Sequence, residues 1–342
     1  MRHIAANFLT LLIVALIGVA LAVDRGQSDF EAPGPLAAPV VVAIERGATL
    51  DEAAAALDAA GALPERTVWG LLAGQQLFKV GTRARRQTRA LKAGEYELPP
   101  GASMAEMLAL ITSGRAIQHA VTVPEGLTSW EVVELLKGVD VLTGELAAVP
   151  PEGSLAPDTY FVSRGMARAE LIRRMSAAQA EILAAAWAAR AEGLPLDSPE
   201  EALILASIVE KETGVGAERA QVASVFVNRL RKGMRLETDP TVIYGITGGQ
   251  GPLGRGLRRS ELIAETPYNT YRIPGLPPTP IANPGRAAIE ATLNPADTPY
   301  FYFVADGTGG HAFSETLSEH NANVRKWRRI EAERAREQQQ AE

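Results

Sequence analysis

A glutamate on the apolar face of a predicted helix is the strongest candidate for chemistry in this chain. In the segment LILASIVEKE (203–212), Glu212 follows four apolar residues at the helical spacings of three, four, seven and eight positions. Glu210 lies on a more polar side, over Ser207. Burial disfavours the charged form of a carboxylate and raises its pKa. Glu212 is therefore predicted to be protonated near neutral pH, as a general acid must be.

The next predicted helix places a cation on its inner face. Val222, Val225, Phe226 and Leu230 form an apolar stripe, and Arg229 occupies the remaining position of that stripe. An arginine on the core side needs a carboxylate or a ligand. The two helices therefore predict a helical hairpin that carries the site, and the neighbouring Asn228 is included as a candidate substrate-binding residue.

Asp239 has two interpretations from the residues alone. Asp239 is followed by Pro240 and then by the helical segment Thr241–Tyr244, which is typical of an N-cap with a proline at the first helical position. Alternatively, Asp239 is the second carboxylate of an inverting glycosidase, because that chemistry needs paired acids.

Tyrosines and an amide gather further along the chain. Tyr268, Asn269 and Tyr271 precede a proline-rich segment at 274–285. Aromatic rings can stack on sugar faces while amides bind hydroxyl and acetamido groups, so these residues and Tyr244 are predicted to line a sugar groove. The alternative is an ordinary packed loop. His311 is a candidate ligand or acid, although a structural role is favoured.

Composition excludes several classes of protein. The chain has 342 residues, 46% hydrophobic and 22% charged, with a net charge of −6. No basic field favours nucleic acid as a partner. The absence of cysteine excludes disulfides and thiolate metal sites. The four histidines lack a spacing such as HExxH. We therefore expect neither a metal nor a cofactor.

The N-terminus carries an apolar run over residues 4–23, interrupted only by Asn7 and Thr10. Twenty residues suffice for a membrane-spanning helix. Ala20–Ala22 resembles the cleavage site of a signal peptide. We favour the anchor because the run is longer than a usual signal core. A transmembrane anchor at 1–27 is predicted, then a linker at 28–39 with three prolines.

A strand–turn–helix unit is predicted three times. Each has a β-prone run, a glycine, a hydroxyl residue and a glutamate three positions later, which is the pattern of a capping box. The hydroxyl–glutamate pairs are Thr49–Glu52, Ser103–Glu106 and Thr128–Glu131. These units predict a small α+β region at 40–145. Within it, the basic segment 82–92 is either a solvated face or a contact with an anionic surface such as lipid head groups.

The character of the chain changes near residue 145. A turn-rich segment is followed by a long alanine-rich helix at 168–193 and a second helix from about Pro199. We predict an α+β fold in which a mixed α/β catalytic domain occupies 146–330. A charged, glutamine-rich tail follows at 331–342.

Several motifs together resemble the endolytic murein transglycosylase family, the YceG-like family, over about residues 150–325. The matching segments are Leu205–Asp239 with Pro240–Tyr244, Pro267–Tyr271, Gly275–Pro278, Tyr302–Ala305 and Gly310–His311. Residues 40–57 are similar to that family's LysM-like region. The family's essential acid directly precedes threonine in its EKET motif, and this position corresponds to Glu212.

The resemblance implies a single-pass inner-membrane enzyme whose bulk lies in the periplasm and which cuts peptidoglycan strands internally. Glu212 would protonate the glycosidic oxygen between N-acetylmuramic acid and N-acetylglucosamine. It would then accept the proton of the C6 hydroxyl, leaving a 1,6-anhydro end. One carboxylate then suffices, which leaves Asp239 free to be a cap. Association with peptidoglycan synthases is also implied.

One segment departs from the family's pattern. Ser154 and Ala156 stand where the family usually has aromatic residues, whereas Asp158 and Tyr160 are retained. Two other interpretations remain: a peptidoglycan hydrolase that uses Glu212 and Asp239, and a non-catalytic wall-binding scaffold in which Glu212 is only structural.

Overall fold

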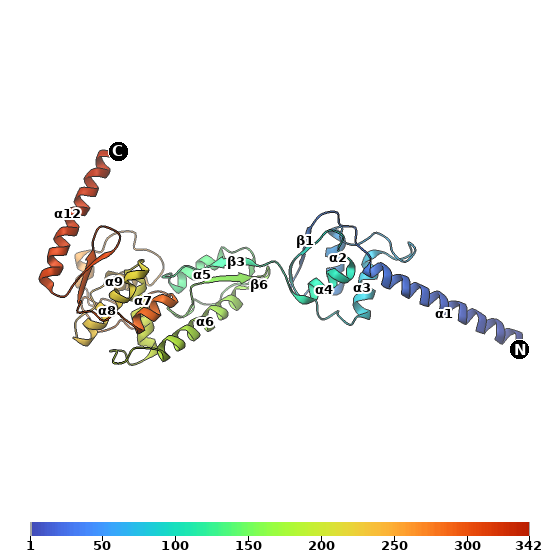
Figure 1. Cartoon of the computed structure of the whole chain (residues 1–342), viewed down its shortest axis with the longest axis horizontal. Coiled ribbons are helices and arrows are strands. Elements are labelled where there is room, and N and C mark those ends of the chain that lie inside the picture. Colours follow the sequence, from blue (N-terminus) through green and yellow to red (C-terminus); the bar gives the residue numbers. More distant parts are fainter. Residues whose placement is uncertain (1, 342) are drawn as a thin grey trace. The chain divides into compact units, whose positions relative to one another are not determined.

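The computed structural model describes residues 2–341, so Met1 and Glu342, the ends of the predicted anchor and tail, lie outside the described residues. The chain forms two compact units (Figure 1). Unit 1 comprises Met1–Ala120, Val141–Thr143 and Phe161–Met166. Unit 2 comprises Val121–Asp140, Gly144–Tyr160 and Ala167–Glu342.

Unit 1 begins with the long helix α1 (Arg2–Glu31). Its stretch Asn7–Glu31 has a mean hydropathy of 2.3 over its most apolar part, which is not buried against the protein. By length and composition it could cross a membrane, and a signal sequence would pass the same test. The helix extends into the predicted linker. Phe30 is 1% exposed and stacks on Phe78, with ring centroids 6.2 Å apart, so the start of that segment is packed rather than free.

The rest of unit 1 is a small α+β core. The elements are β1 (Val40–Ile44), α2 (Leu50–Ala59), α3 (Gly74–Ala84), β2 (Gly94–Leu98) and α4 (Met104–Ser113). Strands β1 and β2 pair antiparallel, with Val42 opposite Tyr96. Alternate residues of both strands face the helices, so one side of this ribbon joins the core. Large side chains that are fully buried in this core include Leu57, Phe78, Tyr96, Leu98 and Ile111.

All three predicted capping boxes are present. Thr49, Ser103 and Thr128 are the N-caps of α2, α4 and α5 (Ser129–Lys137). In each box, the hydroxyl accepts the backbone N–H three residues later, and the glutamate at that position accepts the N–H of the cap. The local sequence pattern was therefore sufficient to position the starts of three helices.

Unit 2 is mainly helical. Its central helices are α6 (Arg168–Ala188), α7 (Pro199–Glu212), α8 (Arg219–Arg231) and α11 (Arg286–Leu293). Helices α7, α8 and α11 contact one another. Their shared core contains fully buried apolar residues, chiefly Leu205, Ile208, Val209, Val222, Phe226, Ile289 and Leu293. The predicted helical hairpin is confirmed, with the short helix η1 (Gly216–Glu218) in its turn.

Shorter elements complete unit 2. They are α9 (Asp239–Thr247), α10 (Arg259–Ile263), β7 (Tyr302–Ala305), β8 (His311–Ser314) and α12 (Leu317–Ala341). Strands β7 and β8 form an antiparallel hairpin in which Phe303 lies opposite Phe313. The α+β fold is confirmed. A mixed α/β domain was predicted for the second half of the chain. Among the described residues, however, every sheet is a two-stranded ribbon, and helices make up most of unit 2.

Two further short ribbons are present among the described residues. These pair β3 (His119–Thr122) with β5 (Thr159–Val162), and β4 (Leu142–Thr143) with β6 (Met166–Ala167). Val121–Asp140 belongs to unit 2. The third capping-box helix, α5, lies in this piece, and Thr128 Oγ1 donates to the Gly249 carbonyl at 2.6 Å.

Candidate active site

Glu212 is the last residue of α7, directly before the turn of the helical hairpin. The helix stops there because the next residue, Thr213, is extended (φ −140°, ψ 126°). The Thr213 N–H makes the last bond of the helix, to the Val209 carbonyl at 3.3 Å. Glu212 lies with Phe226 and Arg229 of α8 in the lining of one pocket. The hairpin therefore brings together the two ionisable groups that the apolar stripes predicted.

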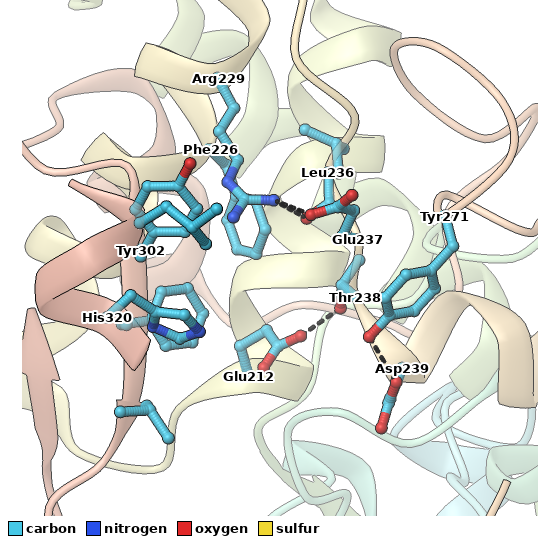
Figure 2. A pocket seen from close by; sticks show the side chains of 13 residues that line it. Glu212, Phe226, Arg229, Leu236, Glu237, Thr238, Asp239, Tyr271, Tyr302 and His320 are labelled. Carbon is cyan, nitrogen blue, oxygen red and sulfur yellow. Dashed lines mark hydrogen bonds and ion pairs between the residues drawn. The ribbon is translucent and has the colours of Figure 1, made fainter. Parts of the chain in front are cut away.

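This pocket has a volume of about 460 Å³ and a mixed lining (Figure 2). Acids, one arginine, one histidine and several aromatic rings surround it. The lining residues are Glu212, Phe226, Arg229, Leu236, Glu237, Thr238, Asp239, Tyr271, Tyr302, Phe303, Val304, Leu317 and His320. Such a surface offers both apolar faces and hydrogen-bonding groups, as a polar ring compound requires.

The surroundings of Glu212 favour the protonated form of its carboxyl. Burial raises the pKa of its carboxyl above the ordinary value of 4.5, and the neighbouring charge of Asp239 raises it further. The hydrogen bond that the Thr238 hydroxyl donates to Glu212 Oε1 opposes this rise. A carboxyl with a raised pKa in a pocket is a candidate general acid.

Glu210 has a different role from Glu212. Its carboxylate accepts the N–H of Gly285 at 2.9 Å, and Gly285 is the N-cap of α11. The arginine of α8 nearest to it, Arg219, lies 3.8 Å away. Glu210 does not line the pocket around Glu212. The structure thus separates a glutamate that stabilises a helix start from one that faces a pocket.

Arg229 is 7% exposed and makes contacts on two sides. Its Nε donates to the Phe301 carbonyl at 2.7 Å, next to β7. Its Nη1 donates to the carbonyls of Arg235 and Leu236, both at 3.0 Å, and forms an ion pair with Glu237 at 3.2 Å. The predicted carboxylate partner is therefore Glu237. Arg229 joins β7 to the segment that leads to Thr238 and α9.

Asp239 is not the N-cap of α9, so that prediction is wrong. Thr238 occupies the cap position, without a side-chain capping bond, and Asp239 is the first residue of the helix. The Asp239 carboxylate instead accepts the Tyr271 hydroxyl at 2.7 Å. The sequence favoured a cap because an aspartate before a proline usually provides one, but here the helix begins one residue earlier.

Two predicted substrate-binding amides are committed to the backbone. Asn228 Nδ2 donates to the carbonyls of Thr298 and Tyr300, at 2.8 and 3.0 Å. Asn269 is fully buried, and its Nδ2 donates to the carbonyls of three residues between 261 and 264. Neither residue lines the pocket around Glu212. Both amides hold the loops that surround the pocket.

Tyr244 and Tyr268 pack against each other, with ring centroids 5.1 Å apart, and Tyr271 alone of the predicted tyrosines lines the pocket around Glu212. The Tyr244 hydroxyl donates to Glu152 at 3.1 Å, and Tyr244 lines a second pocket of about 390 Å³. Burial raises the pKa of Glu152, another acid that the motifs did not indicate.

Of the two histidines in the second half of the chain, His320 lines the pocket, whereas the predicted candidate His311 does not. His311 Nδ1 lies 2.8 Å from Glu218, and its backbone N–H donates to the same carboxylate at 3.0 Å, so it is bound within the fold. His320 lines the pocket and stacks on Tyr302, with ring centroids 5.2 Å apart. Burial lowers the pKa of His320, which favours its neutral form.

Thr238, Tyr302 and His320 line the pocket, although no sequence pattern was taken to indicate them. A threonine immediately before Asp239 and Pro240 is itself a good cap residue, so the start of α9 offered a signal for Thr238. Tyr302 entered the sequence-based prediction only as part of the segment Tyr302–Ala305 that resembles the family, and His320 belonged to no motif. Only the tertiary packing of β7 against α8, and of α12 against β7, brings these two residues to Glu212.

The segment around Ser154 and Ala156 does not line the pocket that holds Glu212. Ser154 Oγ donates to the Pro151 carbonyl at 2.7 Å, and Ala156 is 1% exposed. Tyr160 is buried, and its hydroxyl donates to the Ala156 carbonyl at 2.8 Å. Within the described part of the chain, no three His, Asp or Glu side chains come together as a metal-binding group.

A carboxyl whose pKa is raised by burial, at the wall of a polar, aromatic-lined pocket, is the arrangement expected of the general acid–base enzymes. The chain belongs to the YceG-like family, whose sequence profile matches residues 42–326.

Curated relatives carry one name. A protein of Streptococcus pneumoniae called endolytic murein transglycosylase is 26% identical over 334 residues, which cover 83% of this chain and 58% of the relative. A Bacillus subtilis protein of the same name is 43% identical over 130 residues, which cover 38% of this chain and 35% of the relative. The chain thus spans little more than half of the first relative and about a third of the second.

A solved structure has also been matched. The crystal structure of a YceG-like protein from Listeria monocytogenes is 28% identical to this chain and gives a TM-score of 0.49. The match covers 83% of this chain and 98% of the other.

Proposed function

We propose that this protein is an endolytic lytic transglycosylase, which cleaves the bond between N-acetylmuramic acid and N-acetylglucosamine within peptidoglycan strands. The observation that carries the proposal is Glu212, a carboxyl with a raised pKa on the wall of a polar pocket. The family assignment and the shared name of the relatives support it.

In the first step, Glu212 donates its proton to the glycosidic oxygen, and the bond from that oxygen to C1 of the muramic acid breaks. Burial raises the pKa of the acid and so favours its protonated form before the reaction. The aromatic rings of Tyr271 and Tyr302 in the lining offer surfaces for the apolar faces of sugar rings.

In the second step, the Glu212 carboxylate accepts the proton of the C6 hydroxyl of the same muramic acid. The C6 oxygen then bonds to C1, which closes a 1,6-anhydro ring. Glu212 is thereby returned to its protonated form. No water is consumed. The nucleophile, the C6 hydroxyl, belongs to the substrate and is already held close to C1. A second catalytic carboxylate that activates water is therefore not needed.

Two alternatives remain testable. A hydrolase would use Asp239 to activate water, and Asp239 does line the pocket, although its carboxylate accepts the Tyr271 hydroxyl. A wall-binding scaffold would need no proton transfer by Glu212 at all. Burying a carboxyl in a pocket costs desolvation free energy, and a scaffold would gain nothing from it. The raised pKa of Glu212 therefore favours the enzyme over the scaffold.

The proposal includes the cellular context. Helix α1 would anchor the chain in the inner membrane, with the bulk of the chain in the periplasm, and its apolar stretch Asn7–Glu31 supports this. The region 40–145 would be LysM-like and the region 146–330 catalytic. Of the predicted residues, Glu212 is proposed as the catalytic acid and Arg229, Asp239 and Tyr271 as parts of its pocket. Peptidoglycan synthases are proposed partners.

The test is the product that purified sacculi release. Mass spectrometry should find 1,6-anhydro ends with the wild-type protein and no cleavage with Glu212→Gln, which is nearly isosteric. Glu210→Gln is the matched control, because it makes the same change two residues earlier on α7, outside the pocket. Reducing ends would indicate the hydrolase, and cleavage unchanged by Glu212→Gln would indicate that Glu212 is only structural.

A further inference from the structure

An apolar groove of about 670 Å³ runs between α1 and α3 in unit 1. Seven of its fourteen lining positions lie on α1, four lie on α3 and two, Val68 and Leu72, lie on the short turn before α3. The residues on α1 are Val19, Ala22, Val23, Gly26, Gln27, Phe30 and Glu31. Those beyond α1 are Val68, Leu72, Leu77, Val80, Gly81, Ala84 and Arg85.

The turn beside this groove has an unusual backbone. Thr67 and Leu72 form an isolated antiparallel bridge, and between them Val68, Trp69 and Gly70 have φ values of 49°, 57° and 81°. A left-handed conformation is disfavoured for bulky residues and most of all for a β-branched one. The turn is tied to α1, because the Val68 N–H donates to the Asp29 carboxylate at 2.6 Å.

This turn presents large apolar side chains to solvent. Trp69 is 58% exposed and Leu71 is 78% exposed, and Val80 of α3, which lines the groove, is 54% exposed. Strained backbone that exposes apolar surface is kept where the surroundings or a function hold it in place. Grouped exposed apolar residues of this kind mark an interaction surface.

The position of the groove along α1 indicates what this surface meets. The apolar run of α1 ends at Val23, and the groove lining begins at Val19 and reaches Glu31. At 1.5 Å per residue, those twelve steps span about 18 Å along the helix. If α1 spans a membrane as far as Val23, the near end of the groove is at the depth of the acyl chains and the rest lies at the head groups.

We propose that this groove and the turn 67–72 dock into the bilayer that α1 enters, with Trp69 and Leu71 inserted at the interface and phospholipid acyl chains in the groove. Tryptophan is the residue that membrane interfaces favour, because its ring is apolar and its N–H is polar. The segment 82–92 adds four arginines, all exposed, and no acid, which suits lipid phosphates. This proposal rests on the proposed anchoring by α1, not on glycan cleavage.

The experiment uses the full chain reconstituted in vesicles of phosphatidylethanolamine and phosphatidylglycerol, with and without bromine on the acyl chains. Brominated lipid should quench part of the tryptophan emission of the wild-type protein. Trp69→Phe should lose that quenched part. Trp187→Phe, which changes a tryptophan of unit 2, should keep it. Both changes leave an aromatic ring in place, so neither should prevent folding.

Two results would overturn the proposal. The first is equal quenching in the wild-type protein and in Trp69→Phe, or no quenching in either. The second is a protein that does not float with the vesicles, because α1 would then not be an anchor. The readout does not depend on activity. A quenched Trp69 in a protein that fails to cut glycan would reject the proposed enzyme and leave the docking surface standing.

Discussion

The hydroxyl of Thr238 donates a hydrogen bond to Oε1 of Glu212, and so links the start of α9 to the end of α7 (Figure 2). Thr238 is 2% exposed, so the bond is shielded from water. It fixes the rotamer of the proposed acid. It also favours the charged form and so lowers the pKa of Glu212 against the larger effect of burial. Thr238 is therefore a positioning residue for the proposed reaction.

Thr238→Val should reduce the rate of glycan cleavage about tenfold to a hundredfold without changing the products. A hydrogen bond to an ionisable group contributes about 1.5–3 kcal/mol, and 1.36 kcal/mol corresponds to a tenfold change in rate. Initial rates on purified sacculi provide the measurement. Thr266→Val is the control, because that side chain is exposed and outside the pocket. Equal rates for the two variants would remove Thr238 from the mechanism.

Asp239→Asn should move the alkaline limb of the pH–rate profile to lower pH. Cleavage needs protonated Glu212, so the rate falls as pH rises through its pKa. The charge of Asp239 raises that pKa, so its removal lowers the pKa and shifts the limb towards acid. Tyr271→Phe removes the hydrogen bond to Asp239 but keeps the charge, so its limb should not move to lower pH. Loss of all cleavage in Asp239→Asn, with reducing ends in the wild type, would favour the hydrolase.

Glu212→Gln should stabilise the protein at neutral pH. The folded-state pKa of Glu212 is raised above 4.5, so its contribution to stability is fully present below that pH and is lost as pH rises through the folded pKa. The glutamine variant lacks this loss. Urea unfolding across pH should show a gap in the free energy of unfolding that is widest at neutral pH and closes near pH 4.5. Glu200→Gln, an exposed change at the start of α7, should show no such gap, and a variant less stable than the wild type at neutral pH would contradict the argument.

Local patterns in the sequence predicted much of the fold and part of the site. The capping boxes at Thr49, Ser103 and Thr128 were predictable because each depends on four consecutive residues. The position of Glu212 on an inner helix face was predictable for the same reason, since helical spacing alone decides which side chains share a face. The predicted start of α9 was wrong by one residue. Asp239 was therefore predicted to be a cap, whereas it lies in the first turn of the helix and lines the pocket.

The rest of the site depends on contacts between distant segments. Asn228 and Asn269 look like exposed amides in the sequence, and only the folded loops show that backbone carbonyls take their N–H groups. His320 reaches the pocket because α12 packs on β7. No spacing along the chain encodes these contacts, so residue types alone could not distinguish groups that face the pocket from groups that hold its walls.

Arg229→Met should destabilise unit 2 by about 3 kcal/mol and also reduce cleavage at temperatures where the variant remains folded. The guanidinium satisfies the carbonyls of residues 235, 236 and 301, and each buried acceptor left without a donor costs about 1–3 kcal/mol. Its loss frees the segment that positions Thr238, so activity should fall with stability. Urea unfolding and sacculus cleavage give the two measurements. Lys232→Met, an exposed change just after α8, should alter neither. Full stability in Arg229→Met would show that these bonds do not hold the walls of the pocket.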